Sequence, residues 1–237
     1  MGTNLSNSLP VMIGVVHRDP VGEERLLTVL RRYRPAIVTL EVSPYAMAFR
    51  EENGPRLVAQ LESFVPAERR DHGEIAAIRE TLRQPFELRA AQQYAAENGC
   101  RVELVDDSEI SRLLLQDVED ELLTEANIAR LLKRPDYSLS RTVASFYRRA
   151  RRLLADEPVP PTQLGFSVER LALMQVRDER MAARLHEIVD DALHDRWVHV
   201  GGVFHLLRVK GLRLLWEHLA ARGVDRALLE DLVGSAE

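Results

Sequence analysis

The sequence predicts an α/β fold with a small, mostly parallel sheet flanked by helices, and with a large helical insertion. Short apolar segments alternate with longer segments that have helical periodicity. The first two apolar segments and the helix between them form a β-α-β unit, in which the strands are expected to be parallel with a right-handed crossover. The strands are few and helices separate them, which is typical of α/β domains.

The first β-α-β unit spans residues 9–40. Leu9–Val16 is a nearly continuous apolar run, as expected for a strand that is buried on both faces. Asp19-Pro20 is predicted to start the helix, because Asp caps a first turn well and Pro fits the first helical position. Ala36–Leu40 is predicted as the second strand.

Helices are predicted over most of the remaining chain. Ser43-Pro44 is a start signal, and Asn98-Gly99 is a stop signal. The other predicted elements are strands at Val102–Val105 and Trp197–Val200, and helices within 108–155, at Val168–Leu193 and at about 206–232. We therefore expect one domain over residues 1–237, with its helical insertion at about 43–100 and 108–165.

Composition narrows the class of protein. The 237 residues have a formal net charge of −5, so nucleic acid is not an expected partner. Cys100 is the single cysteine, which excludes an intrachain disulfide and a cysteine-cluster metal site. No apolar run approaches the length of a membrane span. A cytoplasmic location and a small-molecule or peptide substrate are predicted, with a homodimer as a candidate assembly.

Titratable residues lie at or just beyond the ends of the predicted strands. His17 and Glu41 follow the first and second strands, Asp106 follows the third, and the fourth leads to His205. In a parallel sheet all carboxyl ends lie along one edge, where ligands bind in open α/β folds. The four side chains are therefore expected to converge, if all four strands are parallel.

Each histidine follows a glycine in a Gly-x-x-His motif, Gly14–His17 and Gly202–His205. Gly14 lies within a strand, where the missing side chain permits close approach of another backbone or a ligand. Gly201-Gly202 is expected to form a tight turn with positive φ that directs His205 over the sheet edge. Ordinary turn and packing glycines are the alternative interpretation of both motifs.

The long predicted helix has a carboxylate on its apolar stripe. Asp178 falls between Met174 and Met181 on this stripe, and a buried carboxylate needs a charge partner or hydrogen bonds. Either Asp178 or Arg177 orients a histidine, or the pair belongs to a structural ion pair. Adjacent helical residues do not share a face, so Arg177 is not expected on the same face as Asp178.

Two chemistries suit two histidines and a carboxylate. His17, Glu41 and His205 could hold a divalent metal that activates water. Without a metal, a His–Glu pair could act as general base on water. The sequence has no G-x-S-x-G elbow, P-loop or G-x-G-x-x-G motif.

The chain resembles the TraB/PrgY branch of the superfamily that also includes Tiki, GumN-like, ChaN and erythromycin-esterase proteins. The matching segments span nearly the whole chain except for its helical middle, and they are IGVVH (13–17), RPAIVTLE (34–41), RDERMAARL (177–185) and VHVGGVFHL (198–206). The chain departs from the family in Val15, where Thr is common, and in Asp106-Asp107, where Asp-Arg is common. It also lacks the membrane helices of many TraB relatives.

The resemblance implies an α/β core with His17, Glu41 and His205 at one site. Some relatives resemble metal-dependent proteases, others metal-independent esterases, and others haem-binding proteins. We expect a peptidase- or esterase-like hydrolase, with or without Mn, Co or Zn at His17, Glu41 and His205. Asp106, Arg177 and Asp178 are predicted as supporting groups, and Arg50 and Tyr45 as substrate contacts.

Two alternatives stay open. A non-enzymatic protein could bind haem or a peptide at the same site, with Tyr45 as the tyrosine nearest to a strand end. A degenerate family member could instead work as an interaction module, in which case side chains would occlude the site.

Overall fold

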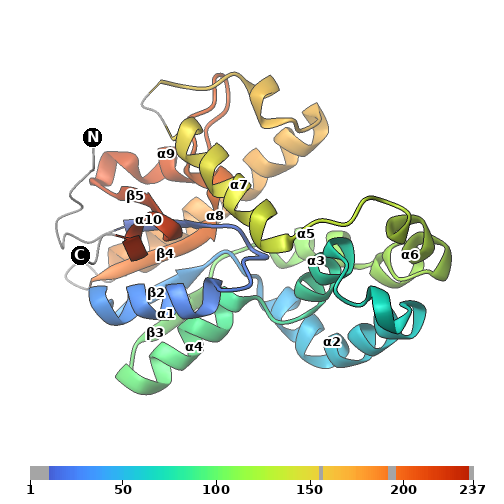
Figure 1. The fold of residues 1–237 in the computed structure, drawn as a ribbon. Helices are drawn as coiled ribbons and strands as arrows, with labels where there is room; N and C mark the ends of the chain where they lie inside the picture. The colour runs from blue at the N-terminus through green and yellow to red at the C-terminus, as the bar shows by residue number, and fades with distance from the viewer. Residues whose placement is uncertain (1–10, 155–156, 192–195, 235–237) are drawn as a thin grey trace.

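The structure is a computed structural model that describes residues 11–154, 157–191 and 196–234. Within them, five parallel strands form one sheet in the order β3-β2-β4-β1-β5 (Figure 1). The strands are β1 (Val11–Val15), β2 (Ile37–Leu40), β3 (Arg101–Leu104), β4 (Trp197–Gly202) and β5 (Asp225–Leu228). The predicted α/β class is confirmed, and the pairing is parallel throughout. Leu9 and Pro10, the start of the first predicted strand, lie outside the described residues.

Strand β4 lies between β1 and β2, although it comes last among the four strands that the sequence predicts. It pairs with β1 on one side, where Gly14 is opposite Gly201, and with β2 on the other side, where Leu40 is opposite Val200. The carboxyl ends of β1, β4 and β2 are therefore neighbours. Residues that follow these three strands are brought to one place.

The fifth strand, β5, was not expected, because the segment 206–232 was predicted as helical. That part of the prediction was wrong. β5 has only four residues, pairs with β1 at the edge of the sheet, and buries Ala227 and Leu228 but not Asp225. A strand this short and half polar gives too little periodicity to be distinguished from a helix end.

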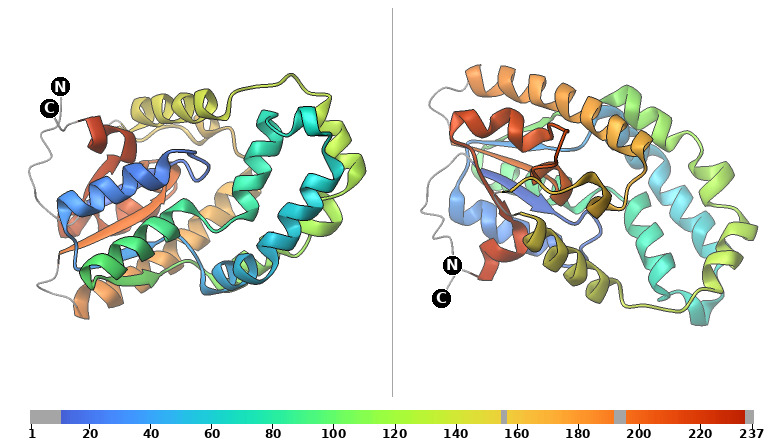
Figure 2. Two further views of the ribbon diagram at one scale, coloured as in Figure 1. Left: turned by 60° about the horizontal axis from the view of Figure 1, so that its bottom comes forward. Right: turned by 90° about the horizontal axis from the view of Figure 1, so that it is seen from above.

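Helices cover both faces of the sheet (Figures 1 and 2). Helices α1, α4, α7 and α10 share a core with the face that presents Ile13, Val38 and Val200. Helices α8 and α9 share a core with the opposite face, which presents Met12 and Trp197. The bounds are α1 Gly22–Tyr33, α4 Phe86–Asn98, α7 Leu139–Leu153, α8 Val168–Asp191, α9 Leu215–Leu219 and α10 Leu229–Gly234.

A separate group of helices extends beside the sheet. Helices α2 (Pro44–Phe64), α3 (Gly73–Leu82) and α6 (Glu125–Leu132) share their own apolar core, and α5 (Ser108–Leu115) packs on α2. Figure 2 shows this helical lobe next to the sheet in both views. Helices α4 and α7 also lie in the segment that was predicted as an insertion. They do not join the helical lobe but pack on the core of the sheet, through Leu88 and Tyr147.

The predicted boundaries of α2 and α4 are confirmed, whereas the predicted start of α1 is wrong. Ser43 caps α2, because its Oγ accepts from Ala46 N–H at 3.0 Å, and Gly99 ends α4 with φ of 68°. Helix α1 begins at Gly22 and not directly after Asp19. The amide of Asp19 bonds to Val16 O at 2.8 Å, which makes a turn before the helix, and the buried Asp19 carboxylate pairs with Arg25 at 3.0 Å.

Gly14 is a position of close approach, as predicted. A Cβ atom there would lie 2.9 Å from Leu206 Cδ2 and 3.3 Å from Val203 Cα. The turn that contains His205 thus packs directly on β1. Within the part of the chain that the structure describes, no helix is long and apolar enough to cross a membrane.

The contact at Gly14 gives a stability prediction. Gly14→Val should lower the free energy of unfolding by about 1–3 kcal/mol, because the added atoms overfill a packed core. Gly234→Ala is the matched control, since a Cβ atom there meets nothing within 4 Å. Urea unfolding curves measure both, and equal stability of Gly14→Val and wild type would contradict the packing described here.

Candidate active site at the carboxyl edge of the sheet

The structure brings the four strand-end residues together. His17 follows β1, Glu41 follows β2, Asp106 follows β3, and His205 lies in a 3-10 turn, Val203–Leu206, after β4. Two of the links are direct: Glu41 lies 2.9 Å from His205 Nε2 through Oε1, and 3.7 Å from His17 Nε2 through Oε2. Asp106 is linked to Glu41 through Arg177.

Glu41 is the centre of the cluster. Its buried Oε1 accepts from His205 Nε2 and from Arg177 Nη2, each at 2.9 Å, and its Oε2 accepts from Gly202 N–H at 2.6 Å. Burial by itself would raise the pKa of Glu41, but the charges of His205 and Arg177 outweigh it and hold the pKa well below its ordinary value. Glu41 is therefore a carboxylate at neutral pH.

His205 is enclosed by two carboxylates. Its Nδ1 lies 2.5 Å from Asp178 Oδ1, and its Nε2 faces Glu41. Burial lowers the pKa of His205, but Asp178 and Glu41 more than compensate and raise it to about 10. Since both nitrogens face acceptors, the ring donates on both sides as an imidazolium. Asp178 thus orients a histidine, which is one of the two roles predicted for it.

Arg177 serves a different partner from its neighbour Asp178. Its Nε and Nη2 donate to the two oxygens of Asp106, at 2.7 and 2.6 Å, and Nη2 also lies 2.9 Å from Glu41. Burial lowers the pKa of Arg177, but Glu41 and Asp106 outweigh this and raise it. Helix α8 therefore supplies two adjacent residues to the site, one cation and one carboxylate.

Glu87 orients the other histidine, and the sequence analysis did not identify it. Its buried carboxylate Oε1 lies 2.8 Å from His17 Nδ1. Partial loss of water lowers the pKa of His17, but the hydrogen bond and charge of Glu87 outweigh it, so the pKa is raised above 6.5. Glu87 precedes Leu88 on the buried side of α4. A carboxylate next to that apolar stripe was the signal that could have revealed it.

The glycines of β4 are needed for contact with the site and not for a turn. Gly201 and Gly202 belong to β4, and Gly202 has φ of −61°, so the predicted positive φ is wrong. A Cβ atom on Gly202 would lie 2.8 Å from His17 Nε2, and one on Gly201 would lie 3.0 Å from Glu41 Oε2. Side chains at Gly201 and Gly202 would collide with His17 and Glu41, which fill the space above this part of β4.

A third histidine, His199, lies in the interior beneath the site and was also missed. Its Nδ1 is 3.0 Å from Thr39 Oγ1, while its buried Nε2 has no hydrogen-bond partner among the described residues. Burial lowers the pKa of His199 to about 4, so it is neutral. Thr39, His199 and Glu41 lie on the same sheet face, because alternate residues of a strand share a face.

A cavity of about 420 Å³ lies over the cluster. His17, Glu41, Asp106 and Arg177 reach its wall, together with the predicted substrate contact Arg50. The His17 side chain is 48% exposed there, whereas that of His205 is only 6% exposed. His17 is therefore the histidine that a ligand can touch.

Tyr45 is not among the residues that line this cavity. Its ring lies under the Arg112 guanidinium, 5.0 Å away, and stacks on Phe49. The structure therefore does not bring Tyr45 to His17, in contrast to Arg50.

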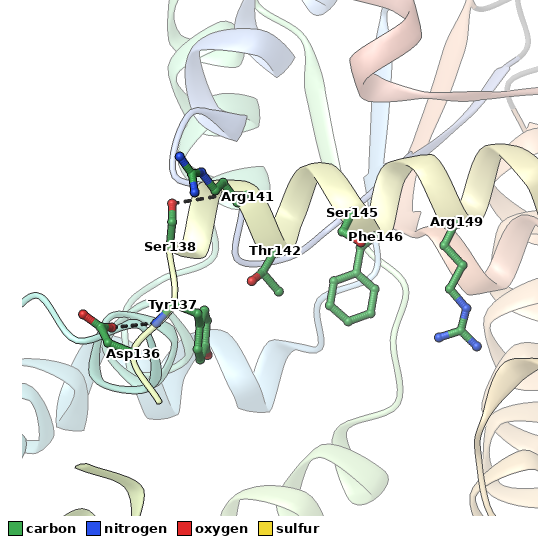
Figure 3. Close-up of a pocket in the computed structure, with 8 residues that line it drawn as sticks. All are labelled: Asp136, Tyr137, Ser138, Arg141, Thr142, Ser145, Phe146 and Arg149. Carbon is green, nitrogen blue, oxygen red and sulfur yellow. Dashed lines mark hydrogen bonds between the residues drawn. The ribbon is translucent and has the colours of Figure 1, made fainter. Parts of the chain in front are cut away.

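A second hollow of about 530 Å³ lies along α7 (Figure 3). Phe146 and Arg149 project to the same side of the helix there, and Asp136 binds the amide of Tyr137 at 2.7 Å. None of the predicted site residues lines this hollow. Among the described residues, its lining contains no histidine and only one carboxylate, that of Asp136.

The predicted metal ligands are engaged with one another. Glu41 already accepts from Arg177, His205 and Gly202, and both nitrogens of His205 face carboxylates. No group of three His, Cys, Asp or Glu side chains among the described residues is arranged to hold a metal ion. His17, Glu41 and His205 therefore do not fit a divalent cation as they stand, because His205 would first have to lose a proton and Glu41 a partner.

The pair Asp178–His205 gives a stability prediction. Asp178→Ala leaves a buried imidazolium with one partner less and should cost about 3–5 kcal/mol of unfolding free energy. Glu179→Ala, on the exposed side of the same helix, should change it by less than about 0.5 kcal/mol. Urea unfolding of both variants is the measurement, and similar effects of the two substitutions would refute a buried charge pair.

The raised pKa of His205 gives a pH dependence. Folding raises this pKa from 6.5 to about 10, so the stabilisation is complete below pH 6.5 and is lost as the pH rises to 10. Over that range, wild type should lose more unfolding free energy than His205→Gln, which has no such proton. Parallel stability curves for the two proteins would contradict the assignment.

Comparison of the chain with protein-family models, with curated proteins and with solved structures finds no match in any of the three. The function is therefore inferred from the side chains of the site and their geometry.

Proposed function

We propose that the protein is a hydrolase that activates water between His17 and Glu41 to cleave an ester or amide bond. The observation that supports this most strongly is the state of His17. Its Nδ1 is held by Glu87 at 2.8 Å, and its half-exposed ring lines the cavity beside a carboxylate that stays ionised. A carboxylate on one nitrogen fixes the tautomer in which the other nitrogen accepts a proton.

We place the attacking water between the two groups. His17 Nε2 and Glu41 Oε2 are 3.7 Å apart, which is beyond hydrogen-bond distance but suits one water that donates to both. As the water oxygen attacks the carbonyl carbon, His17 Nε2 takes its proton. The protonated ring then gives this proton to the leaving oxygen or nitrogen as the carbon–heteroatom bond breaks.

Arg177 is the cation that we assign to the developing negative charge. It lines the cavity, and Asp106 holds its guanidinium through two hydrogen bonds. A fixed cation in a partly dry site stabilises the oxyanion of a tetrahedral intermediate. His205 does not line the cavity and acts through Glu41, so we assign His205 and Asp178 as positioning residues.

The resemblance to the TraB/PrgY branch supports the place of the site more than one class of reaction, because the relatives include protease-like, esterase-like and haem-binding proteins. The segments that carry the resemblance contain His17, Glu41, Arg177 and His205, which are the residues of the site. We propose a metal-independent mechanism for this member, because Arg177 and His205 already occupy the Glu41 carboxylate. A small-molecule or peptide substrate, a cytoplasmic location and a homodimer stay predictions.

The two alternatives have less support. A haem-binding role would need an axial ligand opposite His17, and Tyr45 is engaged with Arg112 and Phe49. An interaction module would be expected to have an occluded site, whereas a cavity of about 420 Å³ lies over His17.

Substitution of the general base tests the proposal. His17→Gln should lower kcat/KM for 4-nitrophenyl esters or chromogenic peptide amides by about 10²- to 10⁴-fold, the usual contribution of a general base. His218→Gln, at a histidine that does not line the cavity, is the control and should keep wild-type activity. The wild-type rate should rise with pH through a pKa above 6.5, because His17 must be unprotonated.

Activity that is equal in wild type and His17→Gln would refute this assignment. Elemental analysis and dialysis against a chelator test the metal-independent form of it. We expect full activity after chelation. A stoichiometric divalent metal whose removal abolishes hydrolysis would overturn the metal-independent form.

A further inference from the structure

We propose that the substrate of this cavity has an oxyanion group, a carboxylate or a phosphate, which Arg50 binds. The proposal rests on the proposed function in one respect, namely that the cavity over His17 receives the substrate. It adds the chemical class of the ligand and the residue that selects it.

Arg50 is a cation without a counterion inside the cavity. Its Nε donates to Thr81 O at 3.1 Å and its Nη1 to Ala46 O at 3.2 Å, so two neutral carbonyl groups fix the guanidinium. No carboxylate of the described residues forms an ion pair with it. Glu87 and Asp106 act on it only as charges at longer range. One edge of the guanidinium stays available for a ligand.

Arg177 lines the same cavity but has carboxylate partners, so the lack of a counterion distinguishes Arg50 from it. Both guanidinium groups line the same cavity, but Arg177 contacts both Asp106 and Glu41. Burial lowers the pKa of Arg50, whereas the two carboxylates raise that of Arg177. A partly buried cation without a counterion is costly, and a bound oxyanion would remove that cost.

The wall of the cavity has more positive than negative charge. Arg18 and Arg170 at the rim also have no carboxylate partner among the described residues, while Glu80 at the rim already pairs with Arg83 at 3.3 Å. Glu41 and Asp106 are neutralised by Arg177 and His205. The excess of arginine over carboxylate side chains in this wall favours the binding of an anion here.

The apolar part of the wall belongs to α5. Leu114 and Leu115 line the cavity there, and Leu114 is 58% exposed. A ligand with an apolar body and one oxyanion end would place the oxyanion on Arg50 and the body on these leucines. The scissile bond would then lie near His17, which lines the same cavity.

Calorimetry with three probes that share a phenyl ring tests the proposal. Benzoate, phenyl phosphate and neutral benzamide are titrated into the full-length protein at low salt. Benzoate or phenyl phosphate should bind at one site, and more tightly than benzamide by about tenfold or more, the value of a charge-assisted hydrogen bond. The tighter of the two anions identifies the substrate group as carboxylate or phosphate.

Variants then locate the binding site. Arg50→Gln should weaken binding of the anion by about tenfold or more. Arg50→Lys keeps the charge and should lose less. Arg56→Gln is the matched control on the same helix, because Arg56 is exposed and already pairs with Glu119, and should bind like wild type. Thermal unfolding of each variant verifies that it is folded.

The outcomes separate this inference from the proposed function. Anion binding that depends on Arg50 in a protein without hydrolytic activity would keep the anion site and reject the hydrolase. Hydrolysis that depends on His17, together with equal binding of the three probes or equal binding to wild type and Arg50→Gln, would overturn the anion site alone.

Discussion

One buried carboxylate connects the central strands of the sheet at their carboxyl ends. Glu41 extends from β2 and accepts from the Gly202 amide of β4, while His205 after β4 and Arg177 of α8 bind its other oxygen. These donors offset the desolvation of the carboxylate and keep it ionised. Removal of Glu41 would leave a buried imidazolium and a guanidinium each one partner short, so the site and the packing of α8 on the sheet depend on the same group.

The two histidines of the site have similar hydrogen-bond partners but differ in exposure and protonation. Each has a buried carboxylate on Nδ1, Glu87 for His17 and Asp178 for His205, and each directs Nε2 toward Glu41. The difference is distance and exposure. His205 is buried at 2.9 Å from Glu41 and keeps its proton, whereas His17 is half exposed at 3.7 Å and can exchange a proton with a ligand. One histidine therefore fixes the carboxylate, and the other is accessible from the cavity.

The sequence predicted the location of the site better than the hydrogen bonds and ion pairs within it. Apolar runs and the residues that end them were enough to place His17, Glu41, Asp106 and His205 at one edge, because parallel strands share an edge. Strand order could not be predicted from one sequence, so the insertion of β4 between β1 and β2 was not foreseen. Glu87 and His199 were missed because their roles depend on contacts distant in sequence. Gly202 was assigned a turn because glycine favours positive φ, whereas here it makes room for His17.

The central position of β4 has a consequence for synthesis of the chain. Strands β1 and β2 do not pair with each other. Both pair with β4, residues 197–202, which is synthesised after most of the chain. Until then each presents an unpaired, apolar edge to the cell, the kind of segment that pairs wrongly with other chains. Contacts that join residues so distant in sequence also slow folding. These edges of β1 and β2 are covered only when β4, in the last fifth of the sequence, completes the sheet.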